Sequence, residues 1–195
     1  NVIVEKGQTT ELTASVSPDN NTDDDQAITW TSSDESIATV SSTMTDSGEA
    51  VTINATDKGG TVTITATAWN GTETSCMVTV PVHIESISLP QNVVIDRGQT
   101  RTLSVIYDPD EHDDTIKDIS WTSKAQDVAT IDTESGMITP VKAGSAEIEV
   151  NVIVETLNGT EKQYTAATTV TIQEKHLDET LGNTIIFTPL DESVL

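Results

Sequence analysis

Two acidic segments contain the residues of this sequence whose types and spacing best suit metal chemistry. They are "SPDNNTDDDQ", residues 17–26, and "DPDEHDD", residues 108–114. Clustered carboxylates and Asn side chains supply the hard oxygen ligands of which calcium takes about six to eight. The candidate ligands are Asp19, Asp23, Asp24 and Asp25 in the first segment and Asp108, Asp110, Asp113 and Asp114 in the second.

The spacing in the first segment does not fit the EF-hand loop. Counted from Asp19, the sixth position is Asp24 rather than glycine, and the twelfth is Trp30 rather than glutamate. Runs of carboxylates are most often solvated loops. We therefore expect two solvated acidic loops and keep calcium as a hypothesis; no other cofactor is indicated.

Trp69 is the residue best placed to contact a ligand. It is out of phase with the alternating apolar residues Val62, Ile64, Ala66 and Ala68, and it directly precedes Asn70-Gly71. An outward indole beside a hairpin turn could stack on a sugar ring or on a partner protein. It could equally cover the module junction or the methyl groups of neighbouring strands, as single exposed apolar residues commonly do.

Residues for catalysis are present but lack motifs. Cys76 is the only cysteine, so no disulfide can form within the chain, and its parity with neighbouring valines indicates a buried free thiol. His83, His112 and His176 have no metal-ligand spacing and are expected to be solvated loop residues. Neither a nucleophile elbow nor a cleft for paired carboxylates is indicated. We predict that the chain is not an enzyme.

The net charge excludes several classes of partner. Nine Lys and Arg against 32 Asp and Glu give −23. A field of this sign repels phosphate backbones and anionic lipid head groups, so nucleic acid and membrane-surface binding are not expected. No apolar run approaches the roughly 20 residues of a membrane span, and direct membrane insertion is therefore not expected.

An internal repeat sets the domain organisation. The stretch "AITWTSSDESIATVS" at residues 27–41 returns as "DISWTSKAQDVATID" at 118–132, 91 positions later. Matches also link residues 1 and 92, and 59 and 143. We predict one domain over residues 1–82, a second over 83–174, and a tail over 175–195 whose "NTIIFTPL" is interpreted as the start of a further domain.

Alternation of apolar and polar residues predicts that both copies are β-sandwiches of six or seven short strands, with no helix. The indole of Trp30 shares a face with Ile28, and that of Trp121 shares a face with Ile119, so both are expected in the structural core. Turns at Asn70-Gly71 and Asn158-Gly159 are predicted to be type I′ hairpins.

The motifs "KGQTTELTASVSP", "ITWTSSDESIATVS" and "GGTVTITATA", with "RGQTRTLSVIYDP" and "GMITPVKAGSAEIEV" in the second copy, resemble the bacterial immunoglobulin-like domain of group 2. The resemblance implies tandem seven-stranded sandwiches without disulfides. In the second copy "HIESISLPQ" supplies a first strand through Ile84, Ile87 and Leu89. The first copy begins past that point, and its first strand is expected to be missing.

The same resemblance implies the function. Members serve as tandem stalk modules of bacterial surface proteins, including adhesins of the intimin and invasin kind, or as accessory modules of secreted glycan-active enzymes. We predict a structural or adhesive stalk, extracellular or on the bacterial cell surface. Its partners would be a host or neighbouring-cell surface protein or glycan and further domains of the parent chain. The alternatives are a carbohydrate-binding accessory module that uses Trp69 and a spacer stiffened by calcium.

Overall fold

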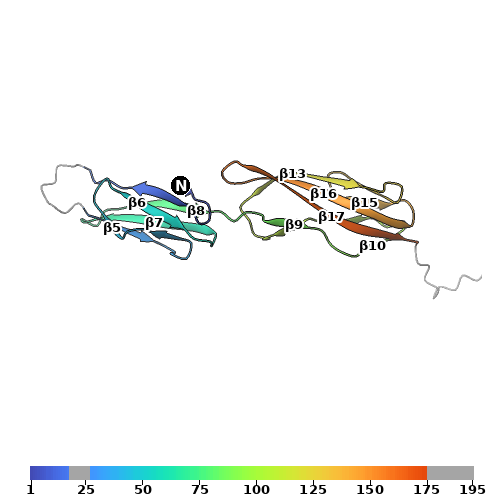
Figure 1. Cartoon of the computed structure of the whole chain (residues 1–195), viewed down its shortest axis with the longest axis horizontal. Coiled ribbons are helices and arrows are strands. Elements are labelled where there is room, and N and C mark those ends of the chain that lie inside the picture. The colour runs from blue at the N-terminus through green and yellow to red at the C-terminus, as the bar shows by residue number, and fades with distance from the viewer. Residues whose placement is uncertain (18–26, 175–195) are drawn as a thin grey trace, which may run out of the picture. The chain divides into compact units, whose positions relative to one another are not determined.

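The computed structural model describes residues 1–17 and 27–174, and every regular element in these ranges is a β-strand (Figure 1). The first repeat contains β1 (Val2–Ile3), β2 (Thr9–Thr13), β3 (Ile28–Ser32), β4 (Ala38–Val40), β5 (Met44–Thr45), β6 (Ala50–Ala55), β7 (Gly60–Ala68) and β8 (Glu73–Val80). The prediction of an all-β fold is confirmed.

The second repeat continues the same pattern. It contains β9 (Ser86–Ser88), β10 (Val93–Asp96), β11 (Arg101–Thr102), β12 (Ile106–Asp108), β13 (Thr115–Ser123), β14 (Ala129–Ile131), β15 (Met137–Pro140), β16 (Gly144–Glu155) and β17 (Glu161–Gln173).

The described residues form two compact units. The first consists of Asn1–Leu89, Ser104–Ser120 and Val150–Ala166, and the second of Pro90–Leu103, Trp121–Glu149 and the described residues from Ala167 onward. The first unit therefore holds β1–β9 and β12, while β13, β16 and β17 contribute residues to both units.

Two sheets of the first unit make up the first sandwich. One has the strand order β1-β8-β7-β3-β5, and the other has the order β2-β6-β4. The β7–β8 pairing is antiparallel and extends from Gly60↔Val80 to Thr67↔Glu73, whereas β1 runs parallel to β8 through Val2↔Val78. The core between the sheets is made of alternate residues of these strands, since successive side chains point to opposite faces.

The strands of the second repeat form sheets of orders β10-β17-β16-β13, β11-β15-β14 and β12-β9. The β10–β17 pairing is parallel, from Val93↔Val170 to Asp96↔Gln173, and so repeats the β1–β8 arrangement. The antiparallel β9–β12 pairing, with Tyr107 opposite Ile87, has no equivalent among the described residues of the first repeat.

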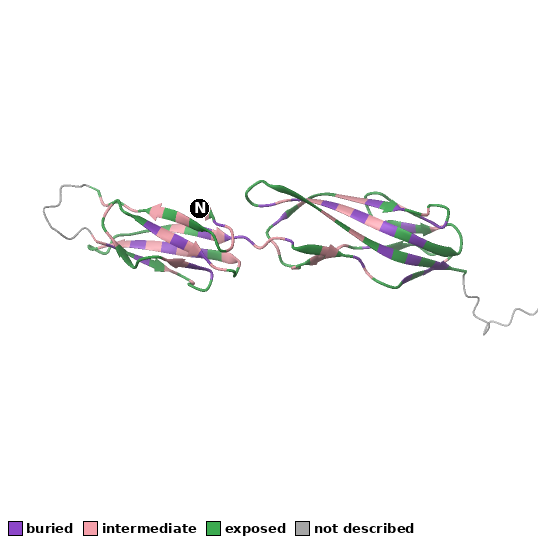
Figure 2. Cartoon of the chain, in the orientation of Figure 1, coloured by how far each residue is buried: buried purple, intermediate pink, exposed green. Residues whose placement is uncertain are grey.

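Burial follows the alternation along the strands. Buried and less buried residues succeed one another along β6 and β16 (Figure 2). Trp30 and Trp121 are 3% and 4% exposed. The indole N–H of Trp30 donates to Thr45 Oγ1 at 2.9 Å, which satisfies the polar edge of the buried ring.

The turn predicted after β7 has a different type from the one expected. Among the described residues Asn92 is the only non-glycine with positive φ, so Asn70 does not take the left-handed conformation that a type I′ turn needs at both central residues. Instead Ala68 and Thr72 close a three-residue loop, with Gly71 at φ +82°. The β16–β17 hairpin repeats this geometry at Gly159, again with φ +82°. The type I′ prediction was therefore wrong at both turns.

Candidate functional site

The second acidic segment attaches the chain at residues 82–84 to β12 and β13. The N–H of Val82 donates to Asp113 Oδ2 at 2.8 Å, and the N–H of Asp113 donates back to the carbonyl of Val82 at 2.8 Å. The N–H of Ile84 donates to Asp114 Oδ2 at 2.8 Å. Asp114 is 6% exposed, so this carboxylate serves as a buried acceptor for the backbone and is not a solvated loop residue.

His83 lies between two carboxylates of the first unit. Its Nδ1 is 2.6 Å from Asp114 Oδ1 and its Nε2 is 2.9 Å from Glu5 Oε2. The other oxygen of Glu5 accepts a hydrogen bond of 2.9 Å from Asn158 Nδ2. The side chain of His83 is only 18% exposed. The expectation of a solvated histidine was wrong, because both partners are distant in the sequence.

The surroundings of His83 favour its charged form. Burial disfavours the imidazolium, but the hydrogen bonds to Asp114 and then Glu5, with the charges of both, raise the pKa of His83 above its ordinary value of 6.5. Nearby, the hydroxyl of Tyr164 donates to the carbonyl of Ile84. Burial, together with the charges of Asp114 and Glu85, raises the pKa of Tyr164 above 10.0.

Two further residues differ from their expected environments. The ring of His112 packs edge-on against Tyr107, with centroids 5.4 Å apart, and its Nδ1 is buried without a hydrogen-bond partner. His112 is therefore not a solvated residue either. The thiol of Cys76 is partly exposed rather than buried, and it lies 3.5 Å from the carbonyl of Met77. His176 lies outside the described residues.

The predicted calcium ligands separate into three groups. Asp19, Asp23, Asp24 and Asp25 lie outside the residues that the structure describes. Asp108 ends β12 and is exposed, as is Asp110. Asp113 and Asp114 bind the 82–84 segment. Within residues 1–17 and 27–174, no group of three or more His, Cys, Asp or Glu is arranged to hold a metal ion.

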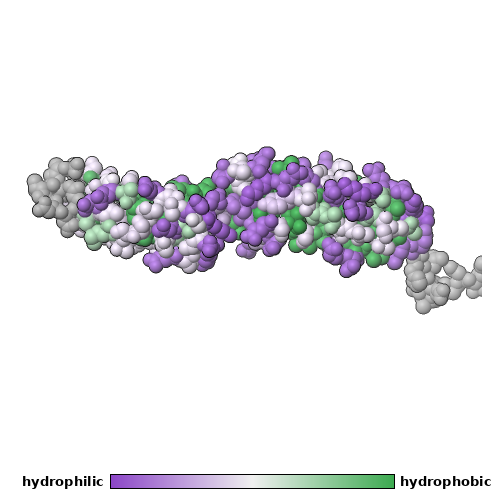
Figure 3. All heavy atoms as spheres, viewed as in Figure 1, coloured by the Kyte–Doolittle hydropathy of each residue, from purple (hydrophilic) through white to green (hydrophobic). Residues whose placement is uncertain are grey.

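Trp69 follows the last residue of β7 and is 50% exposed. Its side chain is thus accessible beside the β7–β8 turn, although it does not line the groove described next. Much of the face seen in Figure 3 consists of hydrophilic residues, with smaller apolar areas among them. No helix in the described part of the chain has the length and apolar content to cross a membrane.

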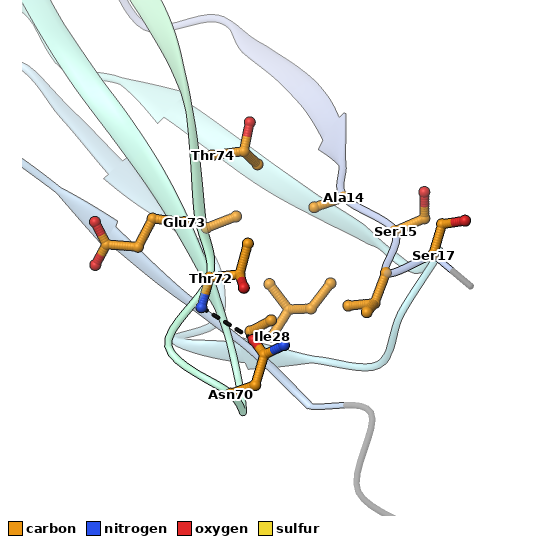
Figure 4. A pocket seen from close by; sticks show the side chains of 11 residues that line it. Ala14, Ser15, Ser17, Ile28, Asn70, Thr72, Glu73 and Thr74 are labelled. Carbon is orange, nitrogen blue, oxygen red and sulfur yellow. Dashed lines mark hydrogen bonds between the residues drawn. The ribbon is translucent and has the colours of Figure 1, made fainter. Parts of the chain in front are cut away.

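A groove opens between the two sheets of the first sandwich, and the sequence did not predict it. Its volume is about 340 Å³. Figure 4 shows Ala14, Ser15 and Ser17 on one side and Thr72 and Thr74 on the other, with Ile28 between them. The carboxylate of Glu73 points away from the groove, and the amide oxygen of Asn70 accepts the N–H of Thr72 at 3.0 Å (Figure 4).

A second hollow of about 260 Å³ continues the groove along the sheets. It shares Ala14, Ala66 and Thr74 with the first and reaches Trp30 and Cys76. Most of the lining side chains are uncharged and either apolar or hydroxylic, and Glu73 is the charged residue among them. Such a lining can bury an apolar group, and the carboxylate of Glu73 points away from the groove (Figure 4).

The fold and these sites define an immunoglobulin-like β-sandwich protein without disulfides. The profile of the bacterial Ig-like domain (group 2) matches residues 1–78 and 83–172, and the chain belongs to this family. The sequence-based identification is thereby confirmed. No curated protein matches the chain.

Three of the solved structures to which the chain is similar are compared with it by identity and coverage. A 282-residue C-terminal fragment of intimin, solved with the intimin-binding domain of the translocated intimin receptor, is 16% identical, with 76% of this chain and 52% of that one covered and a TM-score of 0.32. Domains 4 and 5 of the S-layer protein SbsC are 18% identical, covering 74% and 70%, with a TM-score of 0.34. Domains EC1–3 of mouse protocadherin PcdhgC3 are 14% identical, covering 88% and 65%, with a TM-score of 0.43. The chain therefore spans about half of the intimin fragment.

Proposed function

We propose that the chain is a non-catalytic spacer and adhesive stalk segment of a bacterial cell-surface or secreted protein. Its partners would be a host or neighbouring-cell surface protein or glycan and further domains of the parent chain. The observation that carries the proposal is the tandem family match over residues 1–78 and 83–172. A stalk must resist tension along its length, and the strand pairings of each repeat suit that demand.

The parallel pairings place the hydrogen bonds under shear when the chain is pulled. In the second repeat β10 near the start and β17 at the end run parallel, with register from Val93↔Val170 to Asp96↔Gln173. Tension on the two ends of a repeat then draws these strands past each other, so their hydrogen bonds carry the load together. The β1–β8 pair has the same direction.

Residues 82–84, which connect the two repeats, are held by hydrogen bonds to Asp113 and Asp114. Reciprocal hydrogen bonds join Val82 and Asp113, and Asp114 accepts the N–H of Ile84. Each bond contributes about 1 kcal/mol, and hydrogen bonds to charged groups contribute somewhat more. Residues 82–84 are therefore held by backbone contacts, as expected of a segment that transmits force.

Single-molecule stretching of the whole chain tests the spacer proposal. The N–H of Arg97 donates to the carbonyl of Gln173 at 2.9 Å and extends the β10–β17 ladder. Residues 96–99 form a turn in which Gly98 has φ +90°, and proline is compatible with the position before such a glycine. Arg97→Pro thus removes this donor while it preserves the turn.

We expect the stretched chain to unfold in two events. The substitution Arg97→Pro should lower the unfolding force of one of them. Loss of about 1 kcal/mol corresponds to roughly fivefold faster unfolding if the bond is broken in the transition state. Arg97→Ala is the matched control, because it loses the ion pair to Glu174 but keeps the N–H. The proposal is contradicted if Arg97→Pro and Arg97→Ala unfold at equal forces, or if the unaltered chain extends without force peaks.

A carbohydrate-binding accessory module is the second candidate function, and the half-exposed indole of Trp69 favours it. An exposed ring can stack on a sugar face. A glycan array that compares the unaltered chain with its Trp69→Ala variant tests this role. The carbohydrate-binding role is contradicted if the unaltered chain retains no glycan.

A further inference from the structure

The outer face of the larger sheet in the first sandwich is built around threonines. On the central strand β7, Val62, Ile64 and Ala66 are buried, so the residues that alternate with them point away from the core. These outward residues are Thr61, Thr63, Thr65 and Thr67. On the neighbouring strand β3, Thr29 lies opposite Thr67 and Thr31 lies opposite Thr65. The outer surface of β3, β5, β7 and β8 is called the threonine face below.

Two exposed methionines extend the threonine face. Met77 on β8 lies opposite Thr63 and is 52% exposed, and Met44 on β5 lies opposite Thr29 and is 60% exposed. Among the outward residues of these four strands, Glu73 at the start of β8 is the single charged one. Methionine adapts its shape to a partner surface, and the centres of protein interfaces are rich in methionine and poor in charge. The threonine face therefore has the composition of an interface.

The second repeat shows that the fold does not require a neutral face here. At the spacing that links residues 59 and 143, Thr63 and Thr65 correspond to Glu147 and Glu149 on β16. Glu149 pairs with Lys124 at 3.1 Å. Charged residues thus occupy the same positions in a stable strand. The preference of threonine for β-strands does not by itself explain why the first repeat lacks charge on this face.

The net charge indicates which partner suits the threonine face. The chain carries a charge of −23, so two copies repel each other wherever their acidic loops approach. A face with one carboxylate allows two copies to meet with little of this repulsion. A second copy also presents an equally neutral surface, as the first one requires.

The size of the threonine face suits a weak interface. β7 and β8 contain 9 and 8 residues. Four strands of this length cover about 20 Å by about 25 Å, or about 500 Å². Two such faces in contact bury about 1,000 Å² in total, which lies at the lower limit for specific interfaces.

We propose that two copies of this chain associate sheet against sheet through the threonine face and form a weak twofold-symmetric dimer. In such an interface the same patch contributes from both copies. With the twofold axis at the centre of the face, Thr65 on the middle strand lies near Thr65 of the second copy. This association is independent of the spacer role, since it uses the outer surface of one sheet and not the resistance of the strands to tension.

Sedimentation of the whole chain tests whether the dimer forms. At about 150 mM salt, where repulsion between distant charges is screened, the mean mass should rise above the monomer value of 20.8 kDa as the concentration increases. We expect a dissociation constant of about 1 μM or weaker for so small an interface, so the chain is measured up to about 1 mM. A chain that stays monomeric over this whole range would overturn the proposal.

A charge placed at the centre of the threonine face tests where the copies meet. Thr65→Glu should weaken dimerisation at least tenfold, because two carboxylates then face each other across the interface. The variant is expected to fold, since Glu149 occupies this position in the second repeat. Thr52→Glu is the matched control. Thr52 lies between the buried residues Val51 and Ile53 of β6, so it points outward from the other sheet, and the change in net charge is the same.

The control should dimerise like the unaltered chain, and both variants should keep its melting temperature. If Thr65→Glu and Thr52→Glu weaken dimerisation equally, or if neither does, the threonine face is not the interface.

The methionine methyl groups report the contact directly. The chain has three methionines, Met44, Met77 and Met137, and the last belongs to β15 of the second repeat. In NMR spectra of chain labelled with ¹³C at these methyl groups, we expect the signals of Met44 and Met77 to shift as the concentration rises. The signal of Met137, which is 42% exposed, should stay in place. Equal shifts of all three signals, or a shift of Met137 alone, would overturn the assignment of the interface.

Discussion

The imidazole of His83 links residues that lie far apart in the sequence. It contacts Glu5, 78 positions away, and Asp114, 31 positions away. Asn158 donates to Glu5, and both Asp114 and Glu85 act on Tyr164 within the same compact unit. Two carboxylates therefore face the ring, and the imidazolium satisfies both of them as a donor.

This arrangement predicts a pH-dependent stability. Because the pKa of His83 is raised in the folded state, its contribution is fully present below its unfolded pKa of about 6.5 and is lost as the pH rises through the folded pKa. Melting temperatures measured between about pH 6 and pH 9 should fall over that window, and NMR titration of the ring should give the folded pKa directly.

His83→Gln is the control for this pH dependence. Glutamine can still donate a hydrogen bond to a carboxylate but does not titrate, so the variant should lose most of the change in melting temperature over the window. A wild-type melting temperature that does not change as the pH rises through the folded pKa of His83 would contradict the assignment. So would a variant that retains the full slope, since the pH dependence would then not come from His83.

At the scale of single elements, the β7–β8 hairpin depends on the left-handed glycine. Gly71 has φ +82°, and no atom lies within 4 Å of the position that a Cβ would occupy. Gly71→Ala should therefore cost about 1–2 kcal/mol in unfolding free energy through backbone strain alone. Gly159→Ala, with the same φ and equally open surroundings, should cost a similar amount. Chemical denaturation measures both.

Gly71→Asn distinguishes the backbone explanation from a loss of packing. Asparagine tolerates the left-handed region better than alanine, so this variant should be less destabilised than Gly71→Ala although its side chain is larger. If both substitutions are neutral, the turn adopts a different conformation from the one described.

The elements show which features the sequence could predict. Ile28 and Trp30, or Val62 and Ile64, were assigned to the inner face because alternation with a period of two is local information. The hairpin at Asn70-Gly71 was located correctly, but its type depends on which residues close the loop, and here Ala68 and Thr72 do so. The presence of the strands was thus predictable from the sequence, whereas the residues that close each hairpin loop depend on how the two strands pair.

The contacts of His83 and the groove depend on long-range pairing and were not visible in the sequence. His83 has no local motif, since its partners are Glu5, near the first residue of the sequence, and Asp114, directly before β13. The groove follows from the lack of a pairing partner for residues 15–17 among the described strands, which only comparison with β9 and β12 reveals. An alignment of the two repeats, read for strands present in one copy alone, is the signal that could have found it.

At the scale of the whole molecule, the charge of −23 and the acidic segments raise the question of calcium. Screening of mutual repulsion by any divalent cation should stabilise such a chain, so calcium must be compared with magnesium at fixed ionic strength. Asp113 and Asp114 already accept backbone N–H groups, and Asp114 also pairs with His83, which leaves these oxygens less available to a metal.

We therefore expect thermal melts with millimolar calcium and with magnesium to coincide. A site occupied at about 100 times its dissociation constant would add roughly 2.7 kcal/mol, which corresponds to a rise of several degrees in a small domain. A calcium-specific rise of that size, reversed by excess chelator, would contradict this expectation and favour the spacer stiffened by calcium. In that case Asp108→Asn with Asp110→Asn, and separately the replacement of Asp23, Asp24 and Asp25 by asparagine, would identify the segment that binds the ion, because loss of carboxylate ligands lowers calcium affinity directly.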